Sequence, residues 1–252
     1  MGRHSSGESG PVSLSEPGAA LVTGGAKRIG QAIVLALARM GYDIALHHRS
    51  TDPGSIIDQI KQELPGRRCV PFQADLADVD AVQGLISRVT AEFPNLTVLV
   101  NNASVFLPAR ITDTGHDLLM DQVTINFTAP FLLSRDFART GCHGVIINML
   151  DTRISTSTTT HAAYLLSKKA LAELTLMAAR EFAPHIRVNG IAPGLIMPPE
   201  GENEAYLTGL AARVPLQRPG DPDRVVDALR FIIQHDYLTG QIIYVDGGQH
   251  IP

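Results

Sequence analysis

Cysteine is scarce in this chain, and no apolar stretch is long enough to cross a bilayer. The 252 residues include two cysteines, Cys69 and Cys142, which lie far apart and outside any Cys/His spacing typical of a metal site. A disulfide framework and a zinc site are therefore not expected, and the composition suits a reducing cytoplasm. A membrane-spanning helix needs about 20 consecutive apolar residues, so no membrane partner is expected either.

Positive charge is also in short supply. The 21 Lys and Arg residues are outnumbered by 25 Asp and Glu residues, which gives a formal net charge of −4. Nucleic-acid-binding surfaces normally need a basic face, so nucleic acid is not an expected partner. Residues 1–18 lack the apolar core of a signal peptide, and we expect them to form a flexible polar tail before one domain of residues 19–252.

What the chain does contain is a regular alternation of strand and helix patterns. Hydrophobic residues make up 44% of the sequence, which is typical of a globular protein with a sizeable core. Strands joined by helices predict right-handed crossovers and a parallel sheet covered on both faces, which is a doubly wound (Rossmann) α/β domain. Strands are expected at residues 19–24, 42–48, 68–76, 96–104, 143–150, 186–193 and 240–248, with helices at 28–41, 53–66, 79–93, 118–138 and around Tyr164.

The loop "TGGAKRIG" joins the first strand to the first helix. Ligands of doubly wound sheets bind beyond the carboxyl ends of the strands, so this loop belongs to the expected binding cleft. Gly24 and Gly30 permit close backbone approach, and the amino end of the helix favours a pyrophosphate. Lys27 and Arg28 add positive charge there, and Ile29 completes the loop. A tight turn that needs glycine for geometry alone is the alternative interpretation.

The end of the second expected strand distinguishes between nicotinamide cofactors. An NAD site normally has Asp or Glu there to accept hydrogen bonds from the ribose 2′-hydroxyl, but this chain has His48, Arg49 and Ser50. Arginine can pair with a 2′-phosphate, which a carboxylate would repel. The pattern therefore predicts NADPH, and a solvated polar loop is the alternative.

Three more loops are expected to complete the cleft. Segment 194–210, "GLIMPPEGENEAYLTGL", is punctuated by glycine and proline and is interpreted as a lid whose Leu195, Met197 and Leu207 close over a flat ligand. The cofactor side is expected to include Asp75 and Leu76 of "ADL", Asn102, Ala103 and Ser104 of "NNAS", and Pro193, Gly194 and Ile196 of "APGLI".

Candidate acid–base residues follow the fifth expected strand. Tyr164 and Lys168 are four residues apart on one helix, so they share a face. A neighbouring ammonium is expected to lower the pKa of the tyrosine, which could then pass a proton to a substrate. A surface pair is the alternative. Asp151 ends the strand thirteen residues before Tyr164, where it could also simply cap a turn.

These motifs together resemble the short-chain dehydrogenase/reductase family. "TGGAKRIG", "NNAS", Asn126 in "NFTAPFLL", "YLLSK" and "APGLI" carry the resemblance over nearly the whole chain from Ala19 onward, and "TGQIIYVDGG" is similar to the family's carboxyl-terminal signature. Most members have a serine where this chain has Asp151, and a glycine where it has Arg28. With "HHRS" and "NNASVF", these departures resemble the pteridine reductase branch, including dihydromonapterin reductases.

The resemblance implies specific roles. His48, Arg49 and Ser50 would receive the 2′-phosphate of NADPH, while Asn126 would belong to the catalytic set. The substrate side would consist of Arg28 beside the pyrophosphate and the pterin edge, Ser104 touching cofactor and substrate, Phe106 stacking on the pterin, and Asp151, Tyr164, Leu195 and Met197 around it. Members of this kind usually form homotetramers through their long helices and last strand.

The predicted activity is reduction of a dihydropterin by NADPH. Reduction of a pterin C=N bond requires protonation at nitrogen, and a carboxylic acid can hold and pass such a proton where a serine can only relay it. We therefore expect Asp151, Tyr164 and Lys168 to form a proton-supply chain. A reductase of another carbonyl, such as a 3-oxoacyl thioester, and an NADPH-binding sensor without turnover remain alternatives.

The roles of three residues near the expected Asp151–Tyr164–Lys168 set stay open. Phe106 could instead be a core aromatic residue under the substrate loop. His161, one helical turn before Tyr164, is expected to face solvent, with a place in the pocket as the alternative. The sequence leaves Arg153 equally open.

Overall fold

The computed structural model of the chain describes residues 17–199 and 201–251. Its seven parallel strands form one sheet in the order β3-β2-β1-β4-β5-β6-β7, which confirms the predicted doubly wound α/β domain. The predicted tail, residues 1–18, lies outside the described residues except for its last two positions. The strands are β1 (Ala19–Val22), β2 (Asp43–His48), β3 (Cys69–Gln73), β4 (Leu96–Asn101), β5 (Gly144–Met149), β6 (Ile186–Pro193) and β7 (Ile242–Val245).

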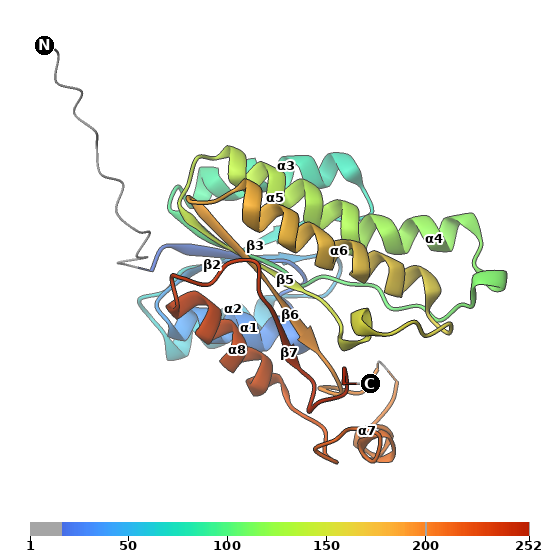
Figure 1. The fold of residues 1–252 in the computed structure, drawn as a ribbon. Helices are drawn as coiled ribbons and strands as arrows, with labels where there is room; N and C mark the ends of the chain where they lie inside the picture. Colours follow the sequence, from blue (N-terminus) through green and yellow to red (C-terminus); the bar gives the residue numbers. More distant parts are fainter. Residues whose placement is uncertain (1–16, 200, 252) are drawn as a thin grey trace, which may run out of the picture.

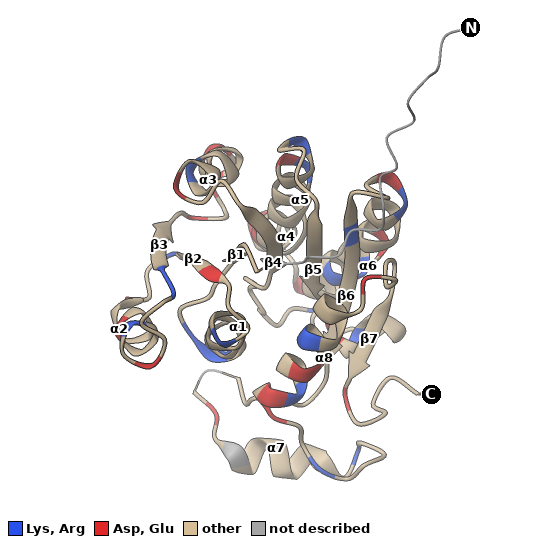
Figure 2. Ribbon diagram, turned by 90° about the vertical axis from the view of Figure 1, so that its left-hand side faces the viewer, with Lys and Arg blue, Asp and Glu red and all other residues tan. Residues whose placement is uncertain are grey.

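Helices cover both faces of this sheet (Figures 1 and 2). One face carries α3 (Val79–Glu92), α4 (His116–Val123), α5 (Ala129–Arg139) and α6 (Ala162–Glu181), and the other carries α1 (Arg28–Arg39), α2 (Gly54–Glu63) and α8 (Pro222–Gln234). The helix α7 (Glu204–Ala211) stands apart from both layers, on the side toward which β6 runs. Three short turns of helix are η1 (Ile111–Asp113), η2 (Thr124–Thr128) and η3 (Thr152–Ser155).

Each face of the sheet packs on its own apolar cluster. Leu133 of α5 and Leu171 of α6 belong to one cluster, and Ile33 of α1 and Leu229 of α8 belong to the other; none of them is more than 1% exposed. Fully burying one such side chain contributes roughly 1.5–3 kcal/mol. Because both faces are covered, strands such as β1 and β5 are buried along their whole length.

Two helices lie where the sequence interpretation placed none, α7 within the expected lid and α8 before the last strand. The start of α8 carries recognisable signals: Asp221 accepts a hydrogen bond from the backbone N–H of Arg224 at 3.2 Å, and Pro222 follows it. Apolar residues then recur at helical spacing. This N-cap and periodicity would have predicted the helix.

The long helix expected at residues 118–138 is continuous in space but not regular. It starts at His116 and widens into the π-helical turn η2 before continuing as α5. Such turns occur frequently at functional sites. Asn126 lies at the centre of this one. No helix of residues 17–199 and 201–251 has the length and apolar character that crossing a membrane would require.

Candidate active site

The strand order reverses between β1 and β4, and the two loops that follow these strands are tied together. From β1 the chain proceeds to β2 and β3 on one side, then returns to β4 on the other. The side-chain amide of Asn102 donates to the carbonyl oxygens of Thr23 at 2.8 Å and Gly24 at 3.2 Å. Open α/β sheets bind their ligands at such a switch point.

The loop after β1 leaves no room for side chains at its glycines. A Cβ on Gly24, whose φ is +62°, would lie 3.1 Å from the Cα of Ala103, and a Cβ on Gly30 would lie 2.1 Å from the carbonyl oxygen of Gly24. The N-cap residue of α1, Lys27, forms no capping hydrogen bond with its side chain. The amino end of α1 therefore presents backbone donors that suit a pyrophosphate.

Arg28 adopts a backbone conformation that favours glycine. Its φ is +56°, in the left-handed region that disfavours residues with a Cβ by roughly 1–2 kcal/mol. The guanidinium crosses the cleft, and its Nη2 donates to the carbonyl oxygen of Pro198 at 2.7 Å. Arg28 thus joins the expected phosphate loop to the segment interpreted as a lid.

His47 fixes the glycine loop after β1 by a hydrogen bond, a role that the sequence interpretation missed. Its Nδ1 accepts the backbone N–H of Gly24 at 3.1 Å, so its Nε2 carries the proton and donates to the carbonyl oxygen of Ala74 at 3.1 Å. Burial lowers the pKa of His47 to about 4, so the ring stays neutral at physiological pH. The only sequence signal for this role was the pair of adjacent histidines at the end of a buried strand.

The side chains at the end of β2 fit a phosphate. The Nδ1 atom of His48 is buried and has no hydrogen-bond partner among the described residues, so it is available to a ligand. Arg49 and Ser50 follow it and are exposed. Their contact with a 2′-phosphate stays a prediction.

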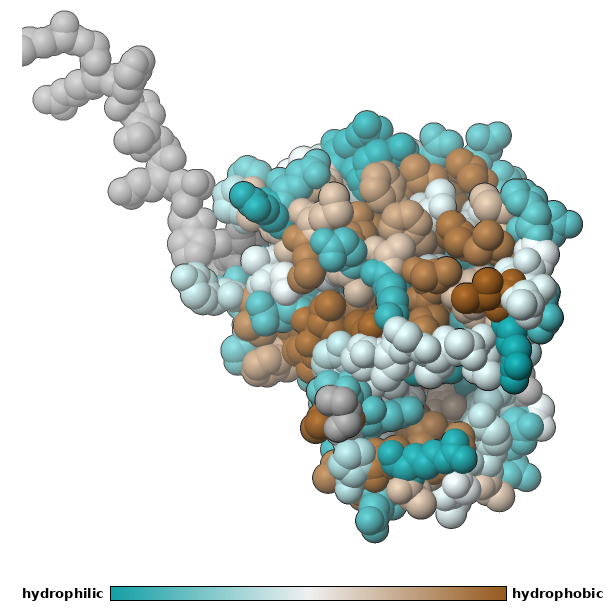
Figure 3. Space-filling view, turned by 45° about the vertical axis from the view of Figure 1, so that its right-hand side comes forward, coloured by the Kyte–Doolittle hydropathy of each residue, from teal (hydrophilic) through white to brown (hydrophobic). Residues whose placement is uncertain are grey.

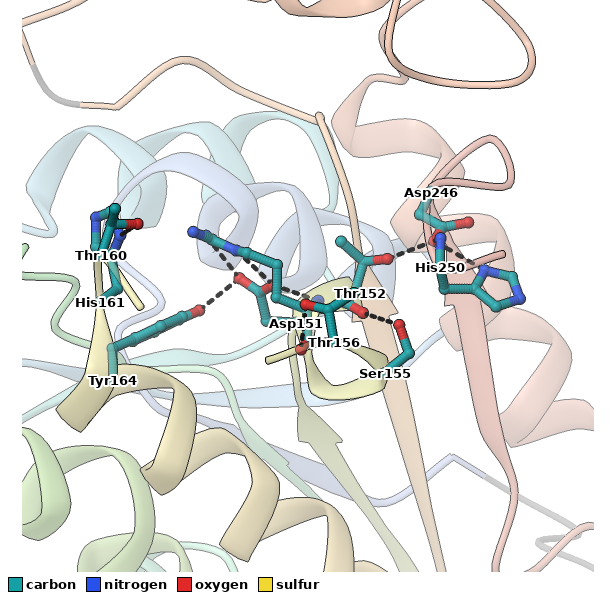
Figure 4. Close-up of polar contacts among 10 residues, drawn as sticks. Asp151, Thr152, Ser155, Thr156, Thr160, His161, Tyr164, Asp246 and His250 are labelled. Carbon is teal, nitrogen blue, oxygen red and sulfur yellow. Dashed lines mark hydrogen bonds and ion pairs between the residues drawn. The ribbon is translucent and has the colours of Figure 1, made fainter. Parts of the chain in front are cut away.

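Tyr164 and Asp151 point toward one another across the end of β5 (Figure 4). The Tyr164 hydroxyl donates to Oδ2 of Asp151 at 2.8 Å, and both residues are at least nine-tenths buried. Oδ1 of Asp151 accepts the backbone N–H of Arg153 at 2.8 Å, which caps η3. Asp151 therefore caps a turn and contacts the tyrosine, and its part in supplying a proton stays a prediction.

The expected effect of Lys168 on Tyr164 is wrong. Burial, together with the neighbouring Asp151 charge, raises the pKa of Tyr164 well above its usual value. The Lys168 ammonium lies 5.9 Å from the centre of the tyrosine ring and donates to the carbonyl oxygen of Met149 at 2.7 Å. Burial lowers the pKa of Lys168 to about 8, against the opposing effect of Asp151. Tyr164 is consequently held as a protonated phenol.

Aromatic and cationic side chains gather beside this pair. Phe106 is 38% exposed, so it is not a core aromatic residue. The ring of His161 stacks on it with 4.2 Å between centres and 4° between planes, which corrects the expectation that His161 faces solvent. Tyr164 meets Phe106 edge to face at 4.7 Å, and the Arg153 guanidinium lies 4.7 Å from the centre of the Phe106 ring.

Asn126 holds the loop that carries Ser104 and Phe106. Its side-chain oxygen accepts the Ser104 hydroxyl at 3.0 Å and the Val105 N–H at 2.9 Å. Its amide nitrogen donates to the Val105 carbonyl at 2.9 Å and to Ser167 at 3.2 Å. The side chain of Asn126 thus holds this loop in place, and its membership of the catalytic set stays a prediction.

Comparison with known proteins assigns the family. Residues 24–250 match the family model described as enoyl-(acyl carrier protein) reductase. FolM alternative dihydrofolate reductase 1 from Brucella suis, solved in complex with NADP, is 34% identical to this chain, with a TM-score of 0.87 over 93% of this chain and 95% of that one.

This chain belongs to the short-chain dehydrogenase/reductase family. It is an NAD(P)-dependent oxidoreductase of that family. Two further relatives are named for substrates that differ from one another. Dihydromonapterin reductase of Citrobacter koseri is 30% identical over 243 residues, covering 94% of this chain and 98% of the relative. The 3-oxoacyl-(acyl-carrier-protein) reductase FabG of Staphylococcus aureus is 30% identical over 248 residues, covering 92% and 98%.

The other predicted cofactor residues of this short-chain reductase line the same edge of the sheet. Asp75 is exposed and accepts the Ala77 N–H at 3.0 Å, so it shapes its own turn. The Leu76 side chain is buried in the core. Gly194 follows Pro193 at the end of β6 and must be glycine, because a Cβ there would lie 2.6 Å from the Cβ of Asp246.

The apolar residues of the expected lid pack into the fold of the short-chain reductase. Ile196 is 5% exposed within the cluster on the α1 face, and Met197 packs against that cluster. Leu195 is partly buried, and its carbonyl oxygen accepts the Gly220 N–H at 2.9 Å. Leu207 on α7 is 6% exposed. Their contact with a ligand stays a prediction.

The carboxyl-terminal segment of the short-chain reductase is fastened next to the site (Figure 4). The hydroxyl of Thr152 donates to Oδ2 of Asp246, which also accepts from the backbone N–H of His250 at 2.8 Å and lies 2.9 Å from its Nδ1. The His250 ring stacks on Tyr244 with 4.0 Å between centres. Thr152 follows Asp151 directly, so this network fixes the start of η3. The sequence interpretation did not include it.

Proposed function

We propose that this short-chain reductase reduces a dihydropterin to a tetrahydropterin with NADPH. The observation that carries the proposal is the buried carboxylate of Asp151, 2.8 Å from the Tyr164 hydroxyl and beside the half-exposed ring of Phe106. A carboxylate hydrogen-bonded to the tyrosine can take part in passing a proton to a pterin ring nitrogen, and an aromatic face can stack on the flat ring. A simple ketone needs neither.

The cofactor site supports NADPH. When bound, NADPH supplies the hydride. The Gly24 loop and the amino end of α1 would hold its pyrophosphate, and the unpartnered Nδ1 of His48 with the adjacent Arg49 would hold its 2′-phosphate. The FolM relatives from Brucella canis and Brucella suis were solved with NADP.

The proposed proton route runs through Asp151, Tyr164 and Lys168. Because its pKa is raised, Tyr164 keeps its proton at working pH and can donate it to the ring nitrogen of the substrate. In the free site this proton lies in the hydrogen bond to Asp151, so the hydroxyl must turn from Asp151 to the substrate when it donates. Lys168 is the proposed inner end of this route, with its ammonium fixed on the Met149 carbonyl 5.9 Å from the centre of the tyrosine ring.

Reduction of a 3-oxoacyl thioester is the second candidate function. The family description and the FabG relative favour it, at the same level of identity as the dihydromonapterin reductase. That chemistry uses the same cofactor loop and the same Tyr164. It gives no reason for a carboxylate at Asp151, where most members have serine. A sensor that binds NADPH without turnover would have no need of the buried Asp151–Tyr164 pair.

NADPH oxidation against a small substrate panel tests the function. The panel contains dihydrobiopterin, dihydromonapterin, dihydrofolate and acetoacetyl thioester, with NADH in parallel. We expect turnover of at least one dihydropterin and a preference for NADPH. Replacing Asp151 with serine, the residue of most family members, should lower kcat/KM for the dihydropterin about 100-fold, because the carboxylate and its hydrogen bond to Tyr164 are lost.

Three outcomes of this panel would count against the proposal. Turnover of the thioester alone would assign the second function, and unchanged pterin turnover in Asp151→Ser would remove Asp151 from the mechanism. NADPH binding without oxidation of any substrate would favour the sensor. Asp136→Ser on α5 is the matched control, since this carboxylate pairs with Arg135 away from the site and its loss should leave turnover as it is.

We also propose that the protein is a homotetramer. Figure 3 shows apolar side chains on the upper half of the molecule. The helices α4, α5 and α6 lie in that half in Figure 1. Phe131 of α5 and Leu176 and Met177 of α6 are 44%, 43% and 61% exposed. Exposed apolar surface can mark a protein interface. Light scattering should give four times the chain mass; a monomer at micromolar concentration would contradict the proposal.

A further inference from the structure

The buried carboxylate of Asp246, directly after β7, accepts hydrogen bonds on both of its oxygens. Oδ1 accepts the backbone N–H of Gly248 at 2.9 Å, and Oδ2 accepts the Thr152 hydroxyl and the backbone N–H of His250. Burial acts to raise the pKa of Asp246, but the hydrogen bonds from Thr152 and His250 and from the backbone outweigh it, so the pKa lies below its usual value. The group is therefore an ionised acceptor at neutral pH.

The sheet fixes the position of this carboxylate. The strand β7 pairs with β6 up to Val245, which lies opposite Pro193, and the Gly194 N–H donates to the Val245 carbonyl oxygen at 3.1 Å. A Cβ on Gly194 would lie 2.6 Å from the Cβ of Asp246, so the two chains are in close contact there. Asp246 thus has little freedom to follow a movement of Thr152.

Thr152 is the second anchor of the segment that carries Asp151. The chain leaves β5 after Leu150, whose N–H donates to the carbonyl oxygen of Ile191 at 2.7 Å. Two residues later the hydroxyl of Thr152, which is 4% exposed, donates to Asp246. Asp151 lies between these two attachments. The direction of its carboxylate therefore depends on both of them.

We propose that Asp246, acting through the Thr152 hydroxyl, positions the Asp151 carboxylate for its hydrogen bond with Tyr164. Figure 4 shows these four side chains following one another across the site. Thr152 and Asp246 are positioning residues, because they act through Asp151. This inference rests on the role of Asp151 in the proposed function. It makes the carboxyl-terminal segment a determinant of the turnover rate.

Thr152→Val keeps the shape of the side chain and removes only the hydroxyl. We expect kcat for the dihydropterin to fall about tenfold, since misplacement of a group by about 1 Å can cost up to about 100-fold. The affinity for NADPH should change less than about threefold. Thr152→Ser, which restores the hydroxyl, should recover most of the lost kcat. A purely structural role of Thr152 would lower the melting temperature and leave kcat unchanged, which would overturn the proposal.

Thr90→Val on α3 is the matched control for loss of a threonine hydroxyl. The hydroxyl of Thr90 donates to the carbonyl oxygen of Ile86 at 3.0 Å, within its own helix and away from the site. Its loss should leave kcat at the value of the wild type. Asp246→Asn places an amide donor where a carboxylate oxygen accepts, so it should reproduce the loss of kcat and serves if Thr152→Val fails to fold.

A double variant tests whether Thr152 acts through Asp151. Asp151→Ser removes the group that is positioned, so adding Thr152→Val to it should lower kcat by less than about twofold, because residues in one hydrogen-bond network are not additive. A further tenfold loss in the double variant would contradict the proposal. Thr152 would then act by a route that does not include Asp151.

The hydrogen bond of Tyr164 can also be observed without turnover. In protein labelled at tyrosine Cζ, the NMR resonance of Tyr164 is assigned by its absence from Tyr164→Phe. We expect Thr152→Val to move this resonance toward the position that it has in Asp151→Ser, whereas Thr90→Val should not move it. An unmoved resonance in Thr152→Val would overturn the proposal.

The two hypotheses fail in distinguishable ways. If the wild type reduces no dihydropterin but the Tyr164 resonance moves in Thr152→Val, the proposed function falls and the positioning of Asp151 remains. If dihydropterins are reduced and Thr152→Val matches the wild type in kcat and in the resonance, the function stands and the role of Asp246 falls.

Discussion

Replacing Tyr164 with phenylalanine is expected to lower kcat about 1,000-fold, within the range of about 100- to 10,000-fold that a positioned proton donor contributes. The hydroxyl is the only part removed, and it is the atom that donates to Asp151 at 2.8 Å. The phenyl ring keeps its edge-to-face contact with Phe106. The affinity for NADPH, titrated by fluorescence, should change less than threefold, which is below about 1 kcal/mol.

Tyr237→Phe is the matched control for loss of a tyrosine hydroxyl. Tyr237 is 99% exposed and lies outside the site, so its replacement should leave both kcat and NADPH affinity at the values of the wild type. A Tyr164→Phe enzyme that retained more than a tenth of its kcat would show that another group supplies the proton. Asp151 would then be the first residue to test.

The fold could be predicted from the sequence because the strands of a buried parallel sheet leave a strong pattern. Each expected strand overlaps an observed one, and the glycine loop after β1 stands where the pattern put it. The omission of α8 was avoidable, since Asp221 and Pro222 are a recognised helix start. The π-helical turn at Asn126 is different, because a widened turn depends on packing and not on local residue types.

The candidate site was predictable as a set of residues but not as a set of contacts. Tyr164, Asp151 and Phe106 come together as expected. The shift in the pKa of Tyr164 has the opposite sign, because burial and the Asp151 charge raise it. Helical spacing places Lys168 nearby but shows neither that burial nor that the ammonium is turned to the Met149 carbonyl. Nor does spacing reveal that Arg153 folds back on Asp151, since that contact depends on the turn formed by η3.

Gly30→Ala is expected to weaken NADPH binding at least tenfold and to lower the melting temperature. Within a helix, alanine is normally better than glycine by about 0.8–1.0 kcal/mol. At this position the new Cβ would lie 2.1 Å from the Gly24 carbonyl oxygen and 2.7 Å from Nδ2 of Asn102. These two atoms form the hydrogen bond that ties the loop after β1 to the loop after β4. Overpacking of this kind typically costs about 1–3 kcal/mol.

Gly84→Ala on α3 separates the helix effect from the loop effect. A Cβ at Gly84 would meet no atom within 4 Å, so this variant should gain up to about 1 kcal/mol of stability and bind NADPH as the wild type does. Thermal unfolding with and without NADPH measures both quantities in the two variants. Equal stability and equal cofactor affinity of Gly30→Ala and Gly84→Ala would contradict the prediction. They would show that the loop can accommodate a side chain at Gly30 and that the close approach of α1 to this loop does not position the cofactor.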